Sequence, residues 1–214
     1  MKTFKNIVLT TLLFFLPLAV LAQSKNYTIN SKVESPSIIF LSTAPLEDIK
    51  GNVQPDKISG SFTFDPNNVA ASSGKVTLLV KAMETGIQLR DEHLHSDVWL
   101  DAEKYPNITF DLKKINNPKI SAKDDKKGRT NYSASAEGII KIHGKSKNIK
   151  VPINLIYIKE SEETRKRASG DFISVDGKFD VALADFGVKG KEGIVGSKVG
   201  KVINIEFKLF FNSK

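Results

Sequence analysis

The dominant pattern in this chain is an alternation of apolar and polar residues with a period of two. Successive side chains of a β-strand point to opposite faces of a sheet, so each alternating segment predicts a strand with one dry and one wet face. The pattern runs through residues 149–157, 173–183 and 203–211, in shorter form through 58–64, 76–82, 108–112 and 132–142, and more weakly through 27–29 and 38–41. We therefore expect about eight or nine antiparallel strands joined by turns.

The first residues have the pattern of a secretory signal peptide. Lys2 and Lys5 precede an apolar run that ends in Val20-Leu21-Ala22, with small residues where a signal peptidase needs them. The run is shorter than the ~20 residues that span a bilayer as a helix. We expect residues 1–22 to be cleaved off, residues 23–214 to form a single domain, and the protein to be periplasmic or secreted.

Composition narrows the classes of partner. The chain has no cysteine, so a lipid-modified cysteine, a disulfide and a thiolate metal site are all excluded. Its net charge of +8 comes from 32 basic and 24 acidic residues that are interleaved along the sequence. Such a mixed surface lacks the basic stripe with exposed aromatic residues that nucleic-acid binding requires, so we expect no nucleic-acid partner.

Alternation also occurs in transmembrane β-barrels, whose strands of ~9–11 residues are flanked by aromatic girdles. Several of the strands expected in this chain are shorter, and Trp99, Tyr105 and Tyr157 occupy no repeating strand-end position. We therefore expect that the protein is not an integral membrane protein.

Three local signals modify the strand pattern. Residues 85–106 break the period of two, and their apolar residues are spaced as in a loop with helical turns, which predicts a lid over one end of the sheet. The Asn-Asn-Pro sequence at 116–118 predicts a turn. Pro152 removes a ladder donor from a strand pattern, so its strand should lie at an edge or be bulged there.

Candidates for catalysis or metal binding are few, since the only histidines are His93, His95 and His143. On a helical turn His93 and His95 diverge by about 200°, which disfavours a shared metal ion. His143 precedes Gly144 at a strand end, where a turn residue is expected. No Gly-x-Ser-x-Gly nucleophile elbow occurs. We expect no catalytic residue, no metal and no cofactor, and the alternative is a hydrolase or metal enzyme centred on these histidines.

The glycine-rich stretch 187–200 has two interpretations. Residues 196–201 are one residue short of a P-loop and lack its Ser/Thr and its following helix, so they do not form a nucleotide loop. The alternatives are a rim of amides and lysines for an anionic headgroup, or a mobile connection. The lysines concerned are Lys189, Lys191, Lys198 and Lys201.

Three motifs carry a family resemblance. Residues 94–110 are LHSDVWLDAEKYPNITF, residues 138–147 are GIIKIHGKSK, and residues 185–188 are DFGV. In order and spacing they resemble the L-x-S-x-x-F-F-D-x-x-K-Y-P-x-I-T-F, G-x-L-T-I-H-G-x-T-K and D-F-G-I motifs of the YceI-like lipid-binding proteins. The chain departs from that pattern at 98–100, at Leu183, where an arginine is usual, and at 42–47, which lack a histidine.

This resemblance implies an all-β fold, an antiparallel eight-stranded lipocalin-like barrel with a short helical lid segment. It also implies an exported binding or carrier protein, not an enzyme, whose interior holds a long apolar or amphiphilic ligand such as a polyisoprenoid or another lipid. The alternative is a structural or protein-interaction barrel with a filled core and no ligand. Periodicity does not separate the two, and the oligomeric state is open, with a homodimer among the alternatives.

The residues expected to bind the ligand are inward-facing apolar residues of the strands, together with two lid residues that would cap the tunnel. They are Phe62, Phe64, Leu78, Val80, Trp99, Leu100, Phe110, Ile140, Ile142, Ile153, Phe179, Val181, Ile205 and Phe207. If the barrel is filled, the same residues form its core.

Overall fold

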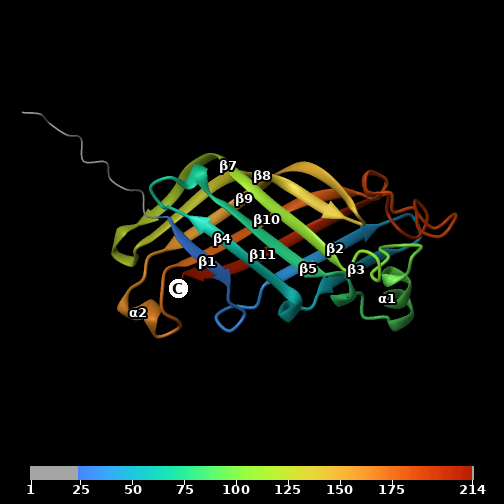
Figure 1. The fold of residues 1–214 in the computed structure, drawn as a ribbon, viewed down its shortest axis with the longest axis horizontal. Helices are drawn as coiled ribbons and strands as arrows, with labels where there is room; N and C mark the ends of the chain where they lie inside the picture. Colours follow the sequence, from blue (N-terminus) through green and yellow to red (C-terminus); the bar gives the residue numbers. More distant parts are fainter. Residues whose placement is uncertain (1–23, 214) are drawn as a thin grey trace, which may run out of the picture.

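Eleven strands form one antiparallel sheet, and eight of them close into a barrel (Figure 1). The computed structural model describes residues 24–213, so the expected signal peptide at 1–22 lies outside the described residues. The strands are β1 (Lys25–Ile29), β2 (Ser37–Thr43), β3 (Asp48–Val53), β4 (Ile58–Phe64), β5 (Ser73–Leu79), β6 (Met83–Glu84), β7 (Asn107–Asp124), β8 (Arg129–Ile142), β9 (Lys145–Ile158), β10 (Phe172–Ala182) and β11 (Val202–Ser213). The helices are α1 (Gln88–His95) and α2 (Glu162–Arg165), and 3₁₀ turns lie at Pro55–Lys57, Val69–Ala71, Val80–Ala82, Asp125–Lys127 and Leu183–Phe186.

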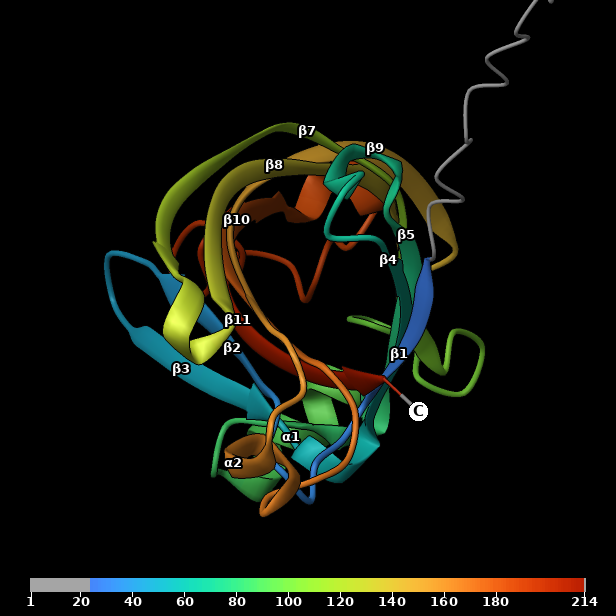
Figure 2. The same cartoon turned by 90° about the vertical axis from the view of Figure 1, so that its left-hand side faces the viewer.

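Closure of the barrel depends on the length of β11. The strand order around the barrel is β1-β4-β5-β7-β8-β9-β10-β11, and β11 pairs again with β1 (Figure 2). The end of β11 pairs with β1, while residues 203–208 pair with β2, so β2, β3 and β6 continue the wall beyond β1, β4 and β5. The expected eight-stranded antiparallel barrel with a short helical segment is confirmed.

The two ends of the barrel differ (Figure 1). At one end lie α2 and the hairpin between β7 and β8, and at the other end lie α1 and the loop 187–201 that precedes β11. Neither helix in residues 24–213 has the length and apolar character needed to cross a bilayer. The lid segment and the glycine-rich stretch are therefore neighbours at the same end.

Strand β7 corrects the expected turn at residues 116–118. The strand continues from Asn107 to Asp124, and its pairing with β8 shifts register between Asn116 and Lys119. Asn117 has a φ of +49°, a left-handed conformation that asparagine adopts more readily than most residues. The Asn-Asn-Pro sequence thus produces a β-bulge, which bends the strand without reversing the chain.

Pro152 marks the place where β9 becomes an edge, as its sequence position predicted. The pairing of β9 with β10 ends at Ile153 opposite Gly177, whereas its pairing with β8 continues back to Lys145. The first half of β9 and the last half of β10 are therefore unpaired with each other. This seam lies in the half of the barrel near α1.

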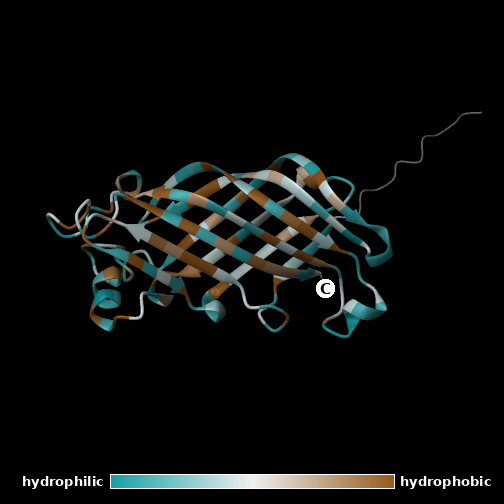
Figure 3. Cartoon of the chain, turned by 180° about the vertical axis from the view of Figure 1, so that it is seen from behind, coloured by the Kyte–Doolittle hydropathy of each residue, from teal (hydrophilic) through white to brown (hydrophobic). Residues whose placement is uncertain are grey.

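Hydrophobic and hydrophilic residues alternate along the strands of the wall (Figure 3). On β9, Val151 and Leu155 are buried inside the barrel, while Lys150 and Asn154 between and beside them are exposed. The same order repeats along β8, whereas residues 209–213 at the end of β11 are all buried, and the hydrophobic face of the sheet is the inner one.

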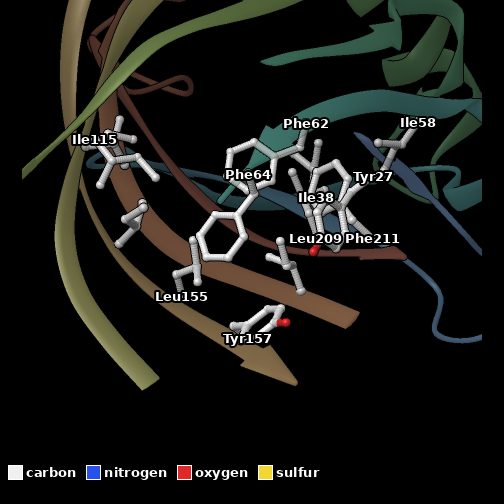
Figure 4. Packing of buried hydrophobic residues seen from close by; sticks show 14 of the residues in the cluster. Tyr27, Ile38, Ile58, Phe62, Phe64, Ile115, Leu155, Tyr157, Leu209 and Phe211 are labelled. Carbon is white, nitrogen blue, oxygen red and sulfur yellow. The ribbon is translucent and has the colours of Figure 1, made fainter. Parts of the chain in front are cut away.

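Aromatic side chains fill the half of the barrel near α2 (Figure 4). Phe64 lies among them, with its ring centroid 6.0 Å from that of Tyr27, 5.8 Å from Phe62 and 5.5 Å from Tyr157. The ring of Phe211 lies 5.8 Å from that of Phe62. Burying each such side chain contributes about 1.5–3 kcal/mol. This half is an ordinary hydrophobic core, and we call these five residues the aromatic plug.

The carboxylate of Asp171 accepts hydrogen bonds from the two tyrosines of the aromatic plug. Asp171 Oδ2 accepts hydrogen bonds from Lys25 Nζ at 2.7 Å, from Tyr157 Oη at 3.3 Å and from Tyr27 Oη at 3.4 Å. Burial alone would raise the pKa of Asp171, but these donors and the backbone N–H of Glu160 outweigh burial and hold the pKa below its usual range. Burial and then the charge of Asp171 raise the pKa of both tyrosines.

Candidate functional site

A cavity of about 910 Å³ occupies the half of the barrel near α1. Its lining comes from β2, β3 and β5 to β11, from the lid segment and from the loop before β11, and it is largely apolar. The charged side chains in the lining are Glu47, Arg90, Lys191 and Lys198. Cavities of ~300–1,000 Å³ are the usual size for small-molecule sites, so this space is large enough for a ligand.

Aromatic rings lie over glycines in the wall of the cavity. Phe40 on β2 pairs with Gly51 on β3, and Phe207 on β11 pairs with Gly177 on β10. A methyl group placed on Gly51 would lie 2.1 Å from Phe40 Cζ, and one on Gly177 would lie 2.9 Å from Phe207 Cζ. Each ring therefore occupies the space that a side chain on the paired strand would fill. The absence of those side chains lets the rings rest against the wall.

Three segments form the mouth of the cavity, namely the β2–β3 turn (44–47), the lid segment (85–106) and the glycine-rich loop (187–201). Arg90 Nη1 of the lid segment donates to Glu47 Oε1 of the turn at 2.6 Å. The backbone N–H of Leu46 donates to the Ser197 carbonyl at 3.0 Å. Trp99 of the lid segment contacts Gly190, where an added methyl would lie 2.6 Å from Trp99 Cη2. Each segment of the mouth is thus joined to the other two.

The glycine-rich loop has a defined structure of its own. The Ile194 carbonyl accepts hydrogen bonds from the backbone N–H groups of Ser197, Lys198 and Val199 at 3.0 to 3.1 Å. Lys191 and Lys198 line the cavity, whereas Lys189 and Lys201 do not. The rim for an anionic headgroup stays a prediction. Of the four lysines expected in it, two line the cavity.

The motifs that carry the family resemblance meet at one corner of the mouth. His143 and Gly144 form the two-residue turn between β8 and β9, both with positive φ, which suits the twist of a hairpin. The ring of Tyr105 lies 4.8 Å from that of His143, nearly perpendicular to it. His143 Nδ1 lies 3.2 Å from the Phe186 carbonyl. Tyr105, His143 and Phe186 belong to the three different motifs. The motifs that carry the resemblance are therefore in direct contact with one another in the fold.

The three histidines make different contacts, although His93 and His95 lie in the same helix. His93 lines the cavity at the mouth, and His95 Nε2 lies 2.9 Å from the Met83 carbonyl. His143 is the turn residue just described. Across residues 24–213, no group of three or more His, Asp or Glu side chains is arranged to hold a metal ion.

Most of the residues expected to bind the ligand line the cavity. These are Leu78, Trp99, Leu100, Phe110, Ile140, Ile142, Phe179, Val181, Ile205 and Phe207. Four others do not line it. Phe62, Phe64 and Ile153 are buried in the core cluster that contains the aromatic plug, and Val80 is buried in the 3₁₀ turn Val80–Ala82, where it packs in one cluster with Leu100. Phe62 and Phe64 differ from the rest because aromatic residues of β1, β9 and β11 lie at the same level of the barrel and fill the space.

The sequence did not single out several other lining residues. Phe40 belongs to the weak alternation at 38–41, whereas Ile49 and Val53 lie in β3, where Lys50, Gly51 and Asn52 obscure the pattern. Leu183, Phe186 and Val188 also line the cavity, and they lie in or beside the DFGV motif. That motif was therefore the signal that could have located this part of the site.

The sequence matches the family model described as the YceI-like domain over residues 27–211. The chain belongs to the YceI-like family. A UPF0312 protein of Vibrio vulnificus is 28% identical over 185 residues, which is 86% of this chain and 88% of the relative. A UPF0312 protein of Pseudomonas aeruginosa is 29% identical over 147 residues, 69% of this chain and 68% of the relative.

Solved structures share the YceI-like fold of this chain. BcnA of Burkholderia cenocepacia superposes with a TM-score of 0.64 at 21% identity, covering 85% of this chain and 98% of that one. A polyisoprenoid binding domain from Saccharophagus degradans, implicated in plant cell wall breakdown, gives 0.62 at 14% identity over 88% and 98%. The YCEI protein of Campylobacter jejuni gives 0.61 at 23% identity over 80% and 89%. Such low identities establish a shared fold and no more.

Proposed function

We propose that this YceI-like protein is an exported carrier that holds one apolar or amphiphilic lipid, such as a polyisoprenoid, in the barrel cavity. The observation that carries the proposal is the cavity itself, about 910 Å³ with a largely apolar lining. Removing apolar surface of a lipid chain from water is worth roughly 25 cal/mol per Å², so a chain that fills this space is bound without specific polar contacts.

The lining suggests how such a lipid lies. The floor of the cavity, toward the aromatic plug, is formed by apolar residues such as Ile38, Val151 and Leu209. The charged lining residues, including Arg90 and Lys198, are all in the mouth segments. We place the apolar chain against the floor and the polar end of the ligand at the mouth.

Two further observations support the carrier. A structural neighbour is named as a polyisoprenoid binding domain. The N-terminal residues have the features of a signal peptide, which supports an exported protein acting in the periplasm or outside the cell. We infer that no reaction is catalysed, because the three histidines make structural or rim contacts in separate places.

Lipid extraction tests the proposal directly. Protein purified without detergent is extracted with organic solvent, and the extract is analysed by mass spectrometry. We expect about one lipid per protein, and we expect prenyl lipids to change the emission of Trp99, the single tryptophan, which lines the cavity. An empty extract together with unchanged emission in a prenyl-lipid titration contradicts the carrier.

A pair of variants separates the cavity from the rest of the barrel. Val181→Phe places a larger side chain in the cavity and should weaken lipid binding, whereas Val202→Phe makes the same change at an exposed position on the adjoining strand. The alternative is a structural or protein-interaction barrel without a ligand. Within residues 24–213, the only observation that favours it is the aromatic plug, which fills the half of the barrel near α2. This alternative predicts no bound lipid in the wild-type protein or in either variant.

A further inference from the structure

Exposed apolar side chains gather around the mouth of the cavity. Leu46, Ile87, Leu89 and Val98 are 71%, 53%, 62% and 48% exposed. They are four of the seven large hydrophobic side chains that are exposed in residues 24–213. Single exposed hydrophobic residues are ordinary, but a group of them around one opening indicates an interaction surface.

These side chains continue the cavity lining onto the outer surface. Ile87, Leu89 and Val98 also line the cavity, so the apolar surface is unbroken from the wall to the rim. Leu46 lies on the β2–β3 turn beyond the lining, and the Arg90–Glu47 ion pair joins that turn to the lid segment. The four side chains therefore stay together as one rim.

Positive charge lies beside this rim. The exposed Lys191 and Lys198 lie on the glycine-rich loop and form no ion pair with any residue in 24–213, whereas the charge of Arg90 is matched by Glu47. The loop 187–201 contains four lysines and one acidic residue, the exposed Glu192, whereas the other side of the mouth carries the exposed Glu92 and Asp97. The basic side of the mouth is thus the glycine-rich loop, and it complements an anionic surface.

We propose that the mouth docks onto an anionic lipid bilayer, with the exposed rim side chains at headgroup depth and the two lysines facing anionic headgroups. An apolar chain is costly to expose to water, so transfer between a bilayer and the cavity is easiest when the opening touches the bilayer. Exposed apolar side chains beside lysines are the combination that binds bilayer interfaces. The docking requires no particular ligand in the cavity.

The test is sedimentation of the purified protein with two kinds of vesicle. One kind contains phosphatidylcholine alone, and the other contains equal parts of phosphatidylcholine and phosphatidylglycerol. We expect binding to the anionic vesicles, weaker binding to the neutral ones, and a loss of the difference at high salt, where surface charges are screened.

Variants assign the binding to the rim. Leu46→Asp and Leu89→Asp should each reduce vesicle binding about tenfold, equivalent to about 1.4 kcal/mol. Ile120→Asp is the matched control, because Ile120 is 60% exposed on β7 at the far end of the barrel. Because Leu46 does not line the cavity, its effect cannot arise from lost ligand contacts.

The lysines need their own control. Lys191→Gln and Lys198→Gln should each weaken binding to anionic vesicles about fivefold, whereas Lys126→Gln and Lys127→Gln, in the 3₁₀ turn at the other end, should have little effect. The melting temperatures of all variants show whether the barrel is intact. The proposal is overturned if the wild-type protein does not bind anionic vesicles or if Ile120→Asp binds them as weakly as Leu46→Asp. It is also overturned if only the lysine substitutions reduce vesicle binding.

Discussion

Arg90 Nη1 lies 2.6 Å from Glu47 Oε1, and this ion pair joins the lid segment to the β2–β3 turn across the mouth of the cavity. Arg90 Nε also donates to Thr85 Oγ1 at 3.1 Å, so the guanidinium is fixed within its own segment as well. The contact connects two segments that are otherwise far apart in the sequence. It is therefore one of the links, together with the contact of Trp99 with Gly190, that hold the lid segment at the opening.

Arg90→Gln should loosen the lid segment without unfolding the barrel. Both partners are partly exposed, so the free energy of unfolding should change by less than about 1 kcal/mol. Hydrogen exchange of the α1 amides should become faster, because the segment has lost one of its links to the mouth. Lys178→Gln, which breaks a pair with Glu206 on the outer wall, should leave α1 exchange unchanged. Equal exchange in both variants contradicts a role for the ion pair.

Gly190→Ala should displace Trp99 from its contact with the glycine-rich loop. Gly190 has a φ of +64°, and an added methyl would lie 2.6 Å from the indole, so the variant combines backbone strain with a steric clash. Gly193→Ala has a similar φ of +73° and open space around it, so it reports the strain alone. We expect the Trp99 emission maximum to shift in the first variant and to stay in place in the second.

The two halves of the barrel should respond differently to loss of a phenyl ring. Phe64→Ala removes the centre of the aromatic plug and should cost about 3–5 kcal/mol of stability. Phe179→Ala removes a ring that already borders the cavity, so it should cost less than Phe64→Ala but weaken lipid binding more. Denaturant melts and lipid titrations of both variants check this. The two-part description of the barrel fails if the order of the two stability losses is reversed.

The Asp171 network predicts a limit to stability at each end of the pH scale. The pKa of Asp171 is lower in the folded protein, so its contribution is complete above the unfolded value of about 3.9 and is lost as pH falls through the folded pKa. The pKa values of Tyr27 and Tyr157 are raised, so their contribution is complete below about pH 10 and declines above it.

Asp171→Asn provides the check on this network. It should remove the part of the acid loss that belongs to Asp171 and lower stability at neutral pH by about 1.5–3 kcal/mol, the worth of hydrogen bonds to a buried charge. Thermal melts from acid to alkaline pH measure both effects. A variant with an unchanged acid slope would show that other carboxylates dominate.

Much of the barrel follows from the sequence because strand faces depend on local periodicity. The segment 58–64 coincides with β4, and the edge at Pro152 follows from the missing donor. The bulge at Asn117 did not follow, because Asn-Asn-Pro suits a turn and a bulge equally and the partner strand decides between them. β3 was also hidden, because it forms by pairing with β2 despite a weak pattern of its own.

By itself, the sequence determined which side chains face inward and which motifs link the chain to its family. It did not determine which inward residues contact each other and which surround a space. Phe64 and Phe207 are both inward-facing phenylalanines of their strands, yet Phe64 meets Tyr27 and Tyr157, while Phe207 rests over Gly177 beside the cavity. That difference depends on which residues of distant strands stand at the same level of the barrel, and only the closed tertiary structure sets those levels.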